Sequence, residues 1–281
     1  MITLASDFGT PYPAAMKGVI VQRTDARLID IAHDFPRQDV RAAAFWLREV
    51  LPYFPPATHL VVVDPGVGTD RDALVVRAGD HTLVGPDNGV LSPTARRLAG
   101  ETNRLETYRI DADGLGPVEP TIATRHGPDT RGPHSSQDRS KTFHGRDVFA
   151  PAAAKVHDTA VTNLESLAWL APMTPDADLE LPTPTLAGDR AIGEVLVVDG
   201  FGNVITNVPG SVLEERTRVR ANGDSVPVGE TFAAVPVGER LATVGGHGYV
   251  ELDVNQGRGD EAFGLEPGDR VVLESVHSDG G

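Results

Sequence analysis

Leu60-Val61-Val62-Val63-Asp64-Pro65-Gly66-Val67-Gly68 is an apolar run that ends in an acidic residue on a turn of proline and glycine. A short apolar run bounded by turn residues predicts a buried strand, which we place at residues 59–63. An acidic residue at the carboxyl end of such a strand commonly faces a ligand-binding crevice. Arg71 follows seven residues after Asp64 and brings the opposite charge to the same spot. The stretch therefore predicts a polar site at the edge of a sheet.

The residues around this run alternate between short apolar segments and amphipathic ones. Strands are expected at 2–4, 28–31 and 59–63, a hairpin at 73–78 and 82–85, and helices at 14–23 and 40–53. This β-α-β order is typical of an α/β domain with a mostly parallel or mixed sheet. A further helix is expected to open near His144 and to run to Lys155.

The composition changes beyond residue 172. Prolines recur from Pro172 to Pro184 and predict an extended linker over 173–188. Short β-like runs between glycine-rich turns follow, at 192–198, 204–207, 217–221, 241–244, 249–254 and 270–273. We therefore expect an N-terminal α/β catalytic domain at 1–172 and a smaller all-β domain at 189–281. Residues 124–141 carry no large apolar side chain, which predicts a flexible insertion in the first domain.

Charge and composition narrow the range of partners. The 281 residues carry a formal net charge of −15, which argues against binding to nucleic acid or to an anionic membrane surface. Scarce lysine beside abundant aspartate is typical of salt-adapted proteins, or of acidic proteins in general. The absence of cysteine excludes disulfides, thiolate nucleophiles and cysteine zinc sites. The first residues do not resemble a signal peptide and no apolar run is long enough to span a bilayer, so we expect a cytoplasmic protein.

Further polar residues follow expected strand ends or begin an expected helix. Asp7 could bind ligand hydroxyls or cap the next helix. Asn88 lies in Gly85-Pro86-Asp87-Asn88-Gly89, which could also be an ordinary tight turn. His144 could be a base, a hydrogen-bond relay or a structural histidine. Asn203 has the donor and the acceptor that suit an adenine edge.

Five motifs occur in order along the chain: Ser6-Asp7-Phe8-Gly9-Thr10, Asp64-Pro65-Gly66-Val67-Gly68 with Arg71, Gly85-Pro86-Asp87-Asn88-Gly89, Thr142-Phe143-His144-Gly145-Arg146-Asp147, and Phe201-Gly202-Asn203 with Thr206-Asn207. Together they strongly resemble the S-adenosyl-L-methionine (SAM) hydroxide adenosyltransferase family, adenosine-forming SAM hydrolases related to fluorinase and chlorinase enzymes. The resemblance spans nearly the whole chain. It implies an N-terminal α/β domain, a C-terminal β domain and a homotrimer. It also implies active sites between one subunit's N-terminal domain and a neighbour's C-terminal domain.

The resemblance implies the site residues as well. Its catalytic set maps onto Asp64, Arg71 and His144, with Asp64 also in contact with the substrate. The substrate-binding residues that it implies are Asp7 at the ribose diol, Asn203 and Phe232 around adenine, Asp199 with Gly246, Tyr249 and Glu251 at the methionine end, Val254 through its strand backbone, and Asn88. Gly246 stands where relatives often carry a hydroxyl side chain, so only backbone contacts are expected there.

The expected reaction is attack of water on C5′ of SAM, which gives adenosine and L-methionine. No metal and no cofactor are expected, because the substrate carries its own leaving group. The presence of Asp64, Arg71 and His144 together favours water over halide. The alternatives are a halogenase-like enzyme that uses SAM and a non-catalytic module that binds adenosine or SAM. A metal-dependent phosphoesterase is a further alternative, with the ligands Asp7, Asp64, Asp87, Asn88 and His144.

Overall fold

The computed structural model describes residues 1–100, 104–119, 140 and 142–276, which form two compact units, Met1–Glu180 and Leu181–Gly281. The division between them lies inside the segment 173–188 that the sequence predicts as a linker. The predicted insertion at 124–141 lies outside the described residues, apart from Ser140. In the part of the chain that is described, no helix is long and apolar enough to cross a membrane.

A seven-stranded mixed sheet forms the centre of the first unit, in the order β2-β1-β3-β5-β4-β6-β7. Its strands are β1 (Ile2–Ser6), β2 (Leu28–Ala32), β3 (Thr58–Val62), β4 (Ala73–Ala78), β5 (His81–Pro86), β6 (Leu105–Ile110) and β7 (Leu170–Pro172). The strands β2, β1, β3 and β5 run parallel, and β4, β6 and β7 pair antiparallel. The expected α/β class with a mixed sheet is confirmed.

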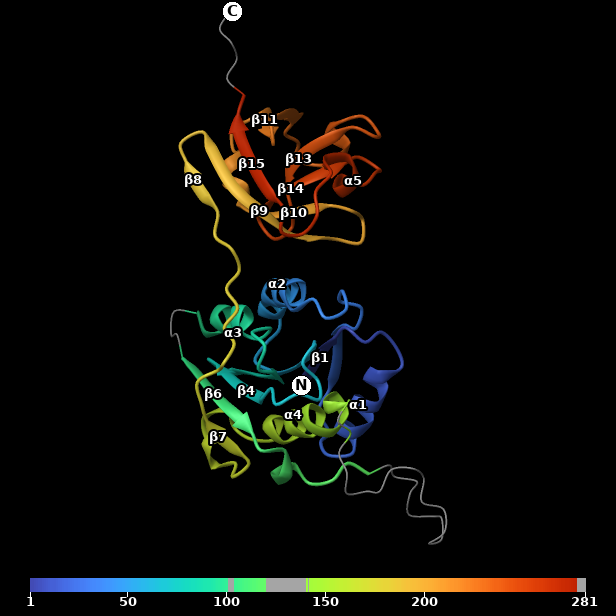
Figure 1. Ribbon diagram of the computed structural model, residues 1–281, viewed down its shortest axis with the longest axis vertical. Helices are drawn as coiled ribbons and strands as arrows, with labels where there is room; N and C mark the ends of the chain where they lie inside the picture. Colours follow the sequence, from blue (N-terminus) through green and yellow to red (C-terminus); the bar gives the residue numbers. More distant parts are fainter. Residues whose placement is uncertain (101–103, 120–139, 141, 277–281) are drawn as a thin grey trace, which may run out of the picture. The chain divides into compact units, whose positions relative to one another are not determined.

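Helices cover both faces of this sheet (Figure 1). The first face carries α1 (Tyr12–Val21) and α4 (Ala150–His157), and the second carries α2 (Val40–Val50) and α3 (Ser92–Ala99). The α2 helix starts where the Asp39 side chain accepts a hydrogen bond from the Ala42 N–H, and Ala43, Ala44 and Leu47 form its buried stripe. The predicted helix at 40–53 is α-helical only to Val50; a 3-10 turn, Leu51–Tyr53, follows because Pro52 lacks an N–H.

The parallel strands bring several polar residues to one edge of the sheet. Asp7 follows β1, Asp64 lies just beyond β3, and Asp87 and Asn88 follow β5. Since the carboxyl ends of adjacent parallel strands meet at a common edge, all of these residues lie on the same side of the unit. This edge is the place that the sequence predicts for a ligand.

The last residues of the first unit are fastened to this edge. Asp87 accepts hydrogen bonds from the backbone N–H groups of Asp176 (2.9 Å) and Ala177 (3.2 Å). Arg96 of α3 donates to the carboxylate of Asp178 (2.6 Å) and to the backbone carbonyl of Leu179. Four consecutive residues, 176–179, therefore pack on the α/β unit although the sequence predicts a linker from residue 173.

The second unit is an antiparallel β domain. Its sheet has the order β12-β11-β15-β9-β10-β14-β13, with β8 paired to β9 outside this path. The strands are β8 (Thr185–Ala187), β9 (Arg190–Val198), β10 (Val204–Pro209), β11 (Arg218–Ala221), β12 (Asp224–Pro227), β13 (Arg240–Val244), β14 (Tyr249–Val254) and β15 (Arg270–Ser275). The expected all-β class is confirmed, and β8, β12 and the short helix α5 (Gly259–Phe263) are additions to the predicted elements.

Candidate active site

The turn after β3 holds a buried ion pair. The side chain of Asp64 is 3% exposed and that of Arg71 is 9% exposed. Arg71 Nη2 donates to Asp64 Oδ2 at 2.5 Å, and Arg71 Nη1 donates to the backbone carbonyl of Asp72. The guanidinium also lies over the ring of Phe149, 5.4 Å from its centroid. Charge, hydrogen bonds and the aromatic face together fix the orientation of the arginine.

His144 completes a cluster with this pair. Its Nδ1 lies 3.5 Å from Arg71 Nη2. An arginine nitrogen can only donate, so Nδ1 is the acceptor and the imidazole proton sits on Nε2. Burial lowers the pKa of His144, the Arg71 charge lowers it further, and the carboxylates of Asp64 and Asp147 do not offset these two effects. The imidazole is therefore neutral at neutral pH.

Asp64 has one carboxylate oxygen in use and one without a partner. Burial raises the pKa of Asp64, although Arg71, His144 and the Gly66 backbone N–H oppose the rise. Its Oδ1 atom is buried and accepts no hydrogen bond from any residue that the structure describes. Buried polar atoms normally have partners, so an orphaned carboxylate oxygen marks a place where a ligand or a water molecule would bind. This atom is the candidate acceptor for a reacting proton.

The glycines of the 64–69 turn allow this arrangement. Gly68 has φ +82°, a left-handed conformation that L side chains rarely adopt. A Cβ added to Gly66 would make only ordinary contacts, 3.6 Å from both Asp64 Oδ1 and Arg71 Cδ. The turn itself closes with the Val67 N–H donating to the Asp64 carbonyl at 3.3 Å. Backbone geometry therefore explains Gly68 of the sequence motif.

Asp7 and Asn88 flank the cluster, and side-chain atoms of both form hydrogen bonds with backbone groups of the protein. Asn88 Nδ2 donates to the Val63 carbonyl (2.9 Å), and its Oδ1 accepts from the Val90 N–H (3.1 Å). Asp7 is 8% exposed and its Oδ2 accepts from the Gln38 N–H at 2.6 Å. The alternative role of Asp7 as a helix cap is wrong, because α1 begins after Pro11 with no side-chain cap.

The second unit carries its own group of predicted residues. Asp199 follows β9, and its Oδ1 accepts from the N–H groups of Phe201 and Asn203, both at 2.9 Å. Its Oδ2 accepts from Asn203 Nδ2 at 3.0 Å. The two predicted residues Asp199 and Asn203 thus hold each other in one turn, and Phe201 at its tip is 81% exposed.

An unexpected acidic group lies beside this turn. Burial raises the pKa of Glu251 to about 7, and the charge of Asp199 adds to the effect. Burial raises the pKa of Asp253 to about 8, helped by Glu251 and Asp199. Both oxygens of Asp253 are buried without a hydrogen-bond partner among the described residues. Glu251 is among the residues predicted for the site and Asp253 is not, although the two-residue period of β14 places both on the same face.

The remaining predicted residues occupy separate positions in this unit. Phe232 starts a 3-10 turn, Phe232–Ala234, and is 42% exposed. Gly246 has open space where a side chain would stand, as a site for backbone contacts requires. Tyr249 and Val254 are the first and last residues of β14, and Val254 is 7% exposed.

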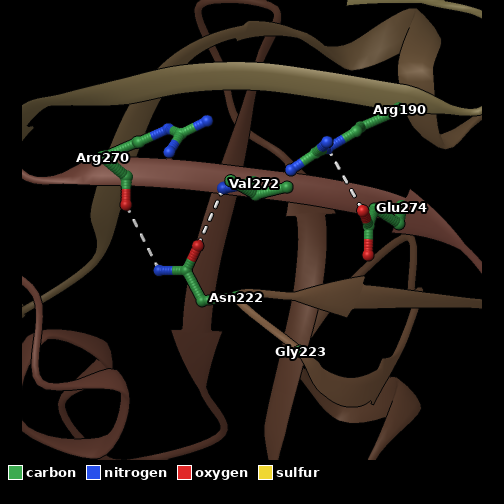
Figure 2. Close-up of a pocket in the computed structure, with 6 residues that line it drawn as sticks. All are labelled: Arg190, Asn222, Gly223, Arg270, Val272 and Glu274. Carbon is green, nitrogen blue, oxygen red and sulfur yellow. Dashed lines mark hydrogen bonds and ion pairs between the residues drawn. The ribbon is translucent and has the colours of Figure 1, made fainter.

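Two hollows on the described part of the surface lie away from the predicted site residues. Figure 2 shows one of about 370 Å³ in the second unit, where Asn222 bridges Arg270 and Val272 beside the Arg190–Glu274 ion pair. Another of about 570 Å³ in the first unit is lined by Arg77, His81 and Arg104 among others. We place the site by the buried charges of Asp64 and Arg71 instead, because neither hollow is lined by a residue that the sequence predicts for the site.

The ligands of the phosphoesterase alternative do not converge. Asp7 accepts from Gln38, Asp87 from Asp176 and Ala177, and Asn88 bonds Val63. Within the described ranges, no group of three or more His, Asp or Glu side chains has the geometry to hold a metal ion. The geometry therefore favours the acid–base cluster over a metal centre.

Comparisons with known proteins cover both units. A family model described as the SAM hydroxide adenosyltransferase N-terminal domain matches residues 2–167, and its C-terminal counterpart matches residues 193–272. A protein of Salinispora tropica named (R)-S-adenosyl-L-methionine hydrolase is 39% identical over 277 residues, covering 96% of each chain. A protein of Thermus thermophilus with the same name is 39% identical over 278 residues, covering 95% of this chain and 97% of the relative.

Solved structures also match this chain over nearly its whole length. A crystal structure of an uncharacterized conserved protein from Thermotoga maritima matches with a TM-score of 0.78 and 30% identity, over 97% of this chain and 99% of the other. A conserved hypothetical protein from Thermus thermophilus matches with a TM-score of 0.68 and 34% identity, over 98% and 99% of the two chains. The ordered motifs, both units and these matches agree, and the chain belongs to the SAM hydroxide adenosyltransferase family.

Proposed function

We propose that this protein is an enzyme that hydrolyses SAM to adenosine and L-methionine. The observation that carries the proposal is the buried cluster in which Arg71 fixes Asp64 Oδ2 and His144 Nδ1 while Asp64 Oδ1 stays unpartnered among the described residues. Relatives that share 39% identity over nearly the whole chain are named (R)-S-adenosyl-L-methionine hydrolase, which supports the same substrate here.

In this reaction the placement of the attacking water matters more than its activation as a nucleophile. The sulfonium makes C5′ electrophilic, and methionine departs as a neutral thioether. The water oxygen forms a bond to C5′ as the C5′–sulfur bond breaks, and the electron pair of that bond goes to sulfur. One proton is released from the water. In-line placement and exclusion of other waters supply most of the acceleration in such a displacement, so we propose that neither metal nor cofactor takes part.

Each residue of the cluster has a role in this scheme. Asp64 Oδ1 accepts the proton of the attacking water, because it is a buried acceptor with a raised pKa and no competing partner in the described part of the chain. Arg71 keeps the carboxylate in place and offsets its negative charge. His144 is neutral and carries its proton on Nε2, so it orients the water by hydrogen bonding rather than by taking its proton.

We further propose that the residues of the second unit bind the adenine and methionine ends, and that the working enzyme is a homotrimer. In this arrangement the first unit of one copy and the second unit of a neighbouring copy supply one site. The exposed rings of Phe201 and Phe232 support a role in stacking on the base. Sedimentation of the purified protein tests the trimer directly.

The function is tested by following SAM turnover in chloride-rich and chloride-free buffer. Adenosine formed at the same rate in both supports hydrolysis, whereas 5′-chloro-5′-deoxyadenosine as the product would establish the halogenase alternative. Tight adenosine binding with no product over hours would instead establish a non-catalytic module. Turnover that is unchanged after chelation agrees with the metal-free scheme, and its loss would contradict that scheme.

A further inference from the structure

A second hydrogen-bonded chain of polar residues lies at the carboxyl edge of the first unit, beyond the cluster just described. Ser6 Oγ lies 2.8 Å from His33 Nδ1, and His33 Nε2 lies 3.0 Å from Asp30 Oδ1. Lys17 Nζ donates to the other carboxylate oxygen of Asp30 at 2.5 Å. Ser6 ends β1, His33 follows β2, Asp30 is the middle residue of β2, and Lys17 lies in α1.

The direction of these hydrogen bonds follows from the charge of Asp30. Burial would raise the pKa of Asp30, but hydrogen bonds from Lys17 and His33 outweigh it and lower the pKa. The ionised carboxylate can only accept, so His33 carries a proton on Nε2. The hydrogen bond between Nδ1 and Ser6 Oγ completes the chain. The order resembles a Ser-His-Asp triad, but Ser6 is fully buried (0% exposed) and cannot act as a nucleophile toward a ligand.

The hydrogen-bonded residues Ser6, His33, Asp30 and Lys17 lie next to the backbone around Asp7. Ser6 is the residue before Asp7, and the backbone carbonyl of His33 accepts from the Gly9 N–H at 2.6 Å, two residues after Asp7. His33 therefore fastens the backbone on both sides of Asp7. The same segment supplies Gln38, whose N–H occupies Asp7 Oδ2 at 2.6 Å. This contact uses only Oδ2, so the other carboxylate oxygen is the one that we assign to a ligand.

We propose that His33 is a positioning residue for ribose recognition: through Ser6, Asp30 and its own carbonyl it holds Asp7 so that one carboxylate oxygen faces the diol of the nucleoside. The inference rests on the proposed function, and it takes from the family resemblance the expectation that Asp7 binds the ribose diol. It adds the Ser6–His33–Asp30–Lys17 chain, whose residues act on the substrate only through Asp7.

Nucleoside binding by the full-length protein tests this role. The probes are adenosine and 2′,3′-dideoxyadenosine, which lacks both hydroxyls, and the measurement is the dissociation constant by calorimetry. The wild type is expected to bind adenosine about tenfold or more tightly than the dideoxy analogue, as a hydrogen-bonded carboxylate would give. In His33→Ala the adenosine affinity is expected to fall toward that of the analogue, while the affinity for the analogue stays the same.

Two further variants distinguish a positioning role of His33 from a general loss of structure. His33→Gln keeps one donor for Asp30 and one acceptor for Ser6, so it is expected to restore much of the preference for adenosine. His157→Gln changes a histidine at the end of α4, which contacts the N-terminal amine, and is expected to leave the preference intact. Equal weakening of both nucleosides in His33→Ala, or an unchanged preference, would overturn the proposal.

The outcome is distinguishable from a failure of the proposed function. A wild type that prefers adenosine but forms no product from SAM would refute hydrolysis and leave the role of His33 standing. A wild type that hydrolyses SAM but shows no preference for the diol would refute the role of His33 and leave hydrolysis standing.

Discussion

Asn88 donates its side-chain amide to the carbonyl of Val63, the residue directly before Asp64. The contact joins the end of β5 to the end of β3 and holds the backbone from which the carboxylate of Asp64 projects. Its oxygen is fixed in turn by the Val90 N–H. The family resemblance implies that Asn88 binds substrate; its two contacts within the protein lead us to expect that it also supports the site through Asp64.

Replacing Asn88 with alanine should lower kcat more than it raises KM. Without the amide the Val63–Asp64 backbone is free to shift, and a small misplacement of a reacting group costs roughly ten- to a hundredfold in rate. Steady-state kinetics with SAM measure the effect. Asn222→Ala is a matched control, since Asn222 makes the same pair of backbone contacts in the second unit, to Arg270 and Val272. A rise in KM alone would assign Asn88 to direct substrate binding.

Replacing Asp64 with alanine should abolish turnover while adenosine still binds. The variant removes the unpartnered oxygen that accepts the proton, and general-base groups contribute roughly a hundred- to ten-thousandfold to a rate. Single-turnover assays for product, run beside calorimetry with adenosine, separate chemistry from binding. Asp70→Asn alters an exposed carboxyl in the same loop and serves as the control. Unchanged turnover in Asp64→Ala would remove this residue from the mechanism.

The pH dependence of kcat/KM should show an acid limb above the ordinary range of an aspartate. Burial raises the pKa of Asp64, so its active, ionised form is lost as the pH falls through that raised value. The pKa of His144 is lowered, so the imidazole remains neutral over the upper part of this range. A pH–rate profile of the wild type and of His144→Gln measures this. The acid limb should persist in His144→Gln, and its disappearance there would make His144 the base.

The sequence predicted the sheet and its polar edge well for a local reason. Apolar runs such as Leu60–Val63 have the strand period and end in turn residues, so their type is readable without tertiary information. The pairing of Asp64 with Arg71 was predictable too, because one short turn joins the two residues. His144 was placed with them by the family resemblance, and the structure has it 3.5 Å from Arg71.

Contacts that depend on tertiary register could not be read in this way. Nothing in the types or spacing of Ser6 and His33 indicates that they meet, since β1 and β2 must first pair in parallel. The segment 176–179 reads as a proline-rich linker, yet the carboxylate of Asp87 captures its backbone. Asp7 does not cap α1, whose N-cap is Pro11, and its carboxylate instead accepts from the N–H of Gln38, a residue beyond β2.

Replacing Asp253 with asparagine should stabilise the protein at alkaline pH. The pKa of Asp253 is raised to about 8 and that of Glu251 to about 7, so the folded state holds more protons than the unfolded chain between about pH 4 and pH 8. The free energy of unfolding therefore decreases as the pH rises through this window, and the contribution of each acid is fully present only below its unfolded pKa. Asparagine removes the charge that would otherwise be buried without a partner among the described residues.

Thermal unfolding at pH 5 and pH 8.5 measures this difference in wild type and variant. The Tm of Asp253→Asn should exceed that of the wild type by several degrees at pH 8.5, because a buried charge costs on the order of a few kcal/mol and each kcal/mol moves the Tm by about 2–4 °C at this size. The two Tm values should approach each other at pH 5, where Asp253 is protonated. Asp224→Asn, at a side chain that is 64% exposed in the same unit, should show no such pH-dependent gain. Equal gains at both pH values would mean that packing, and not the charge of Asp253, sets the stability of this strand.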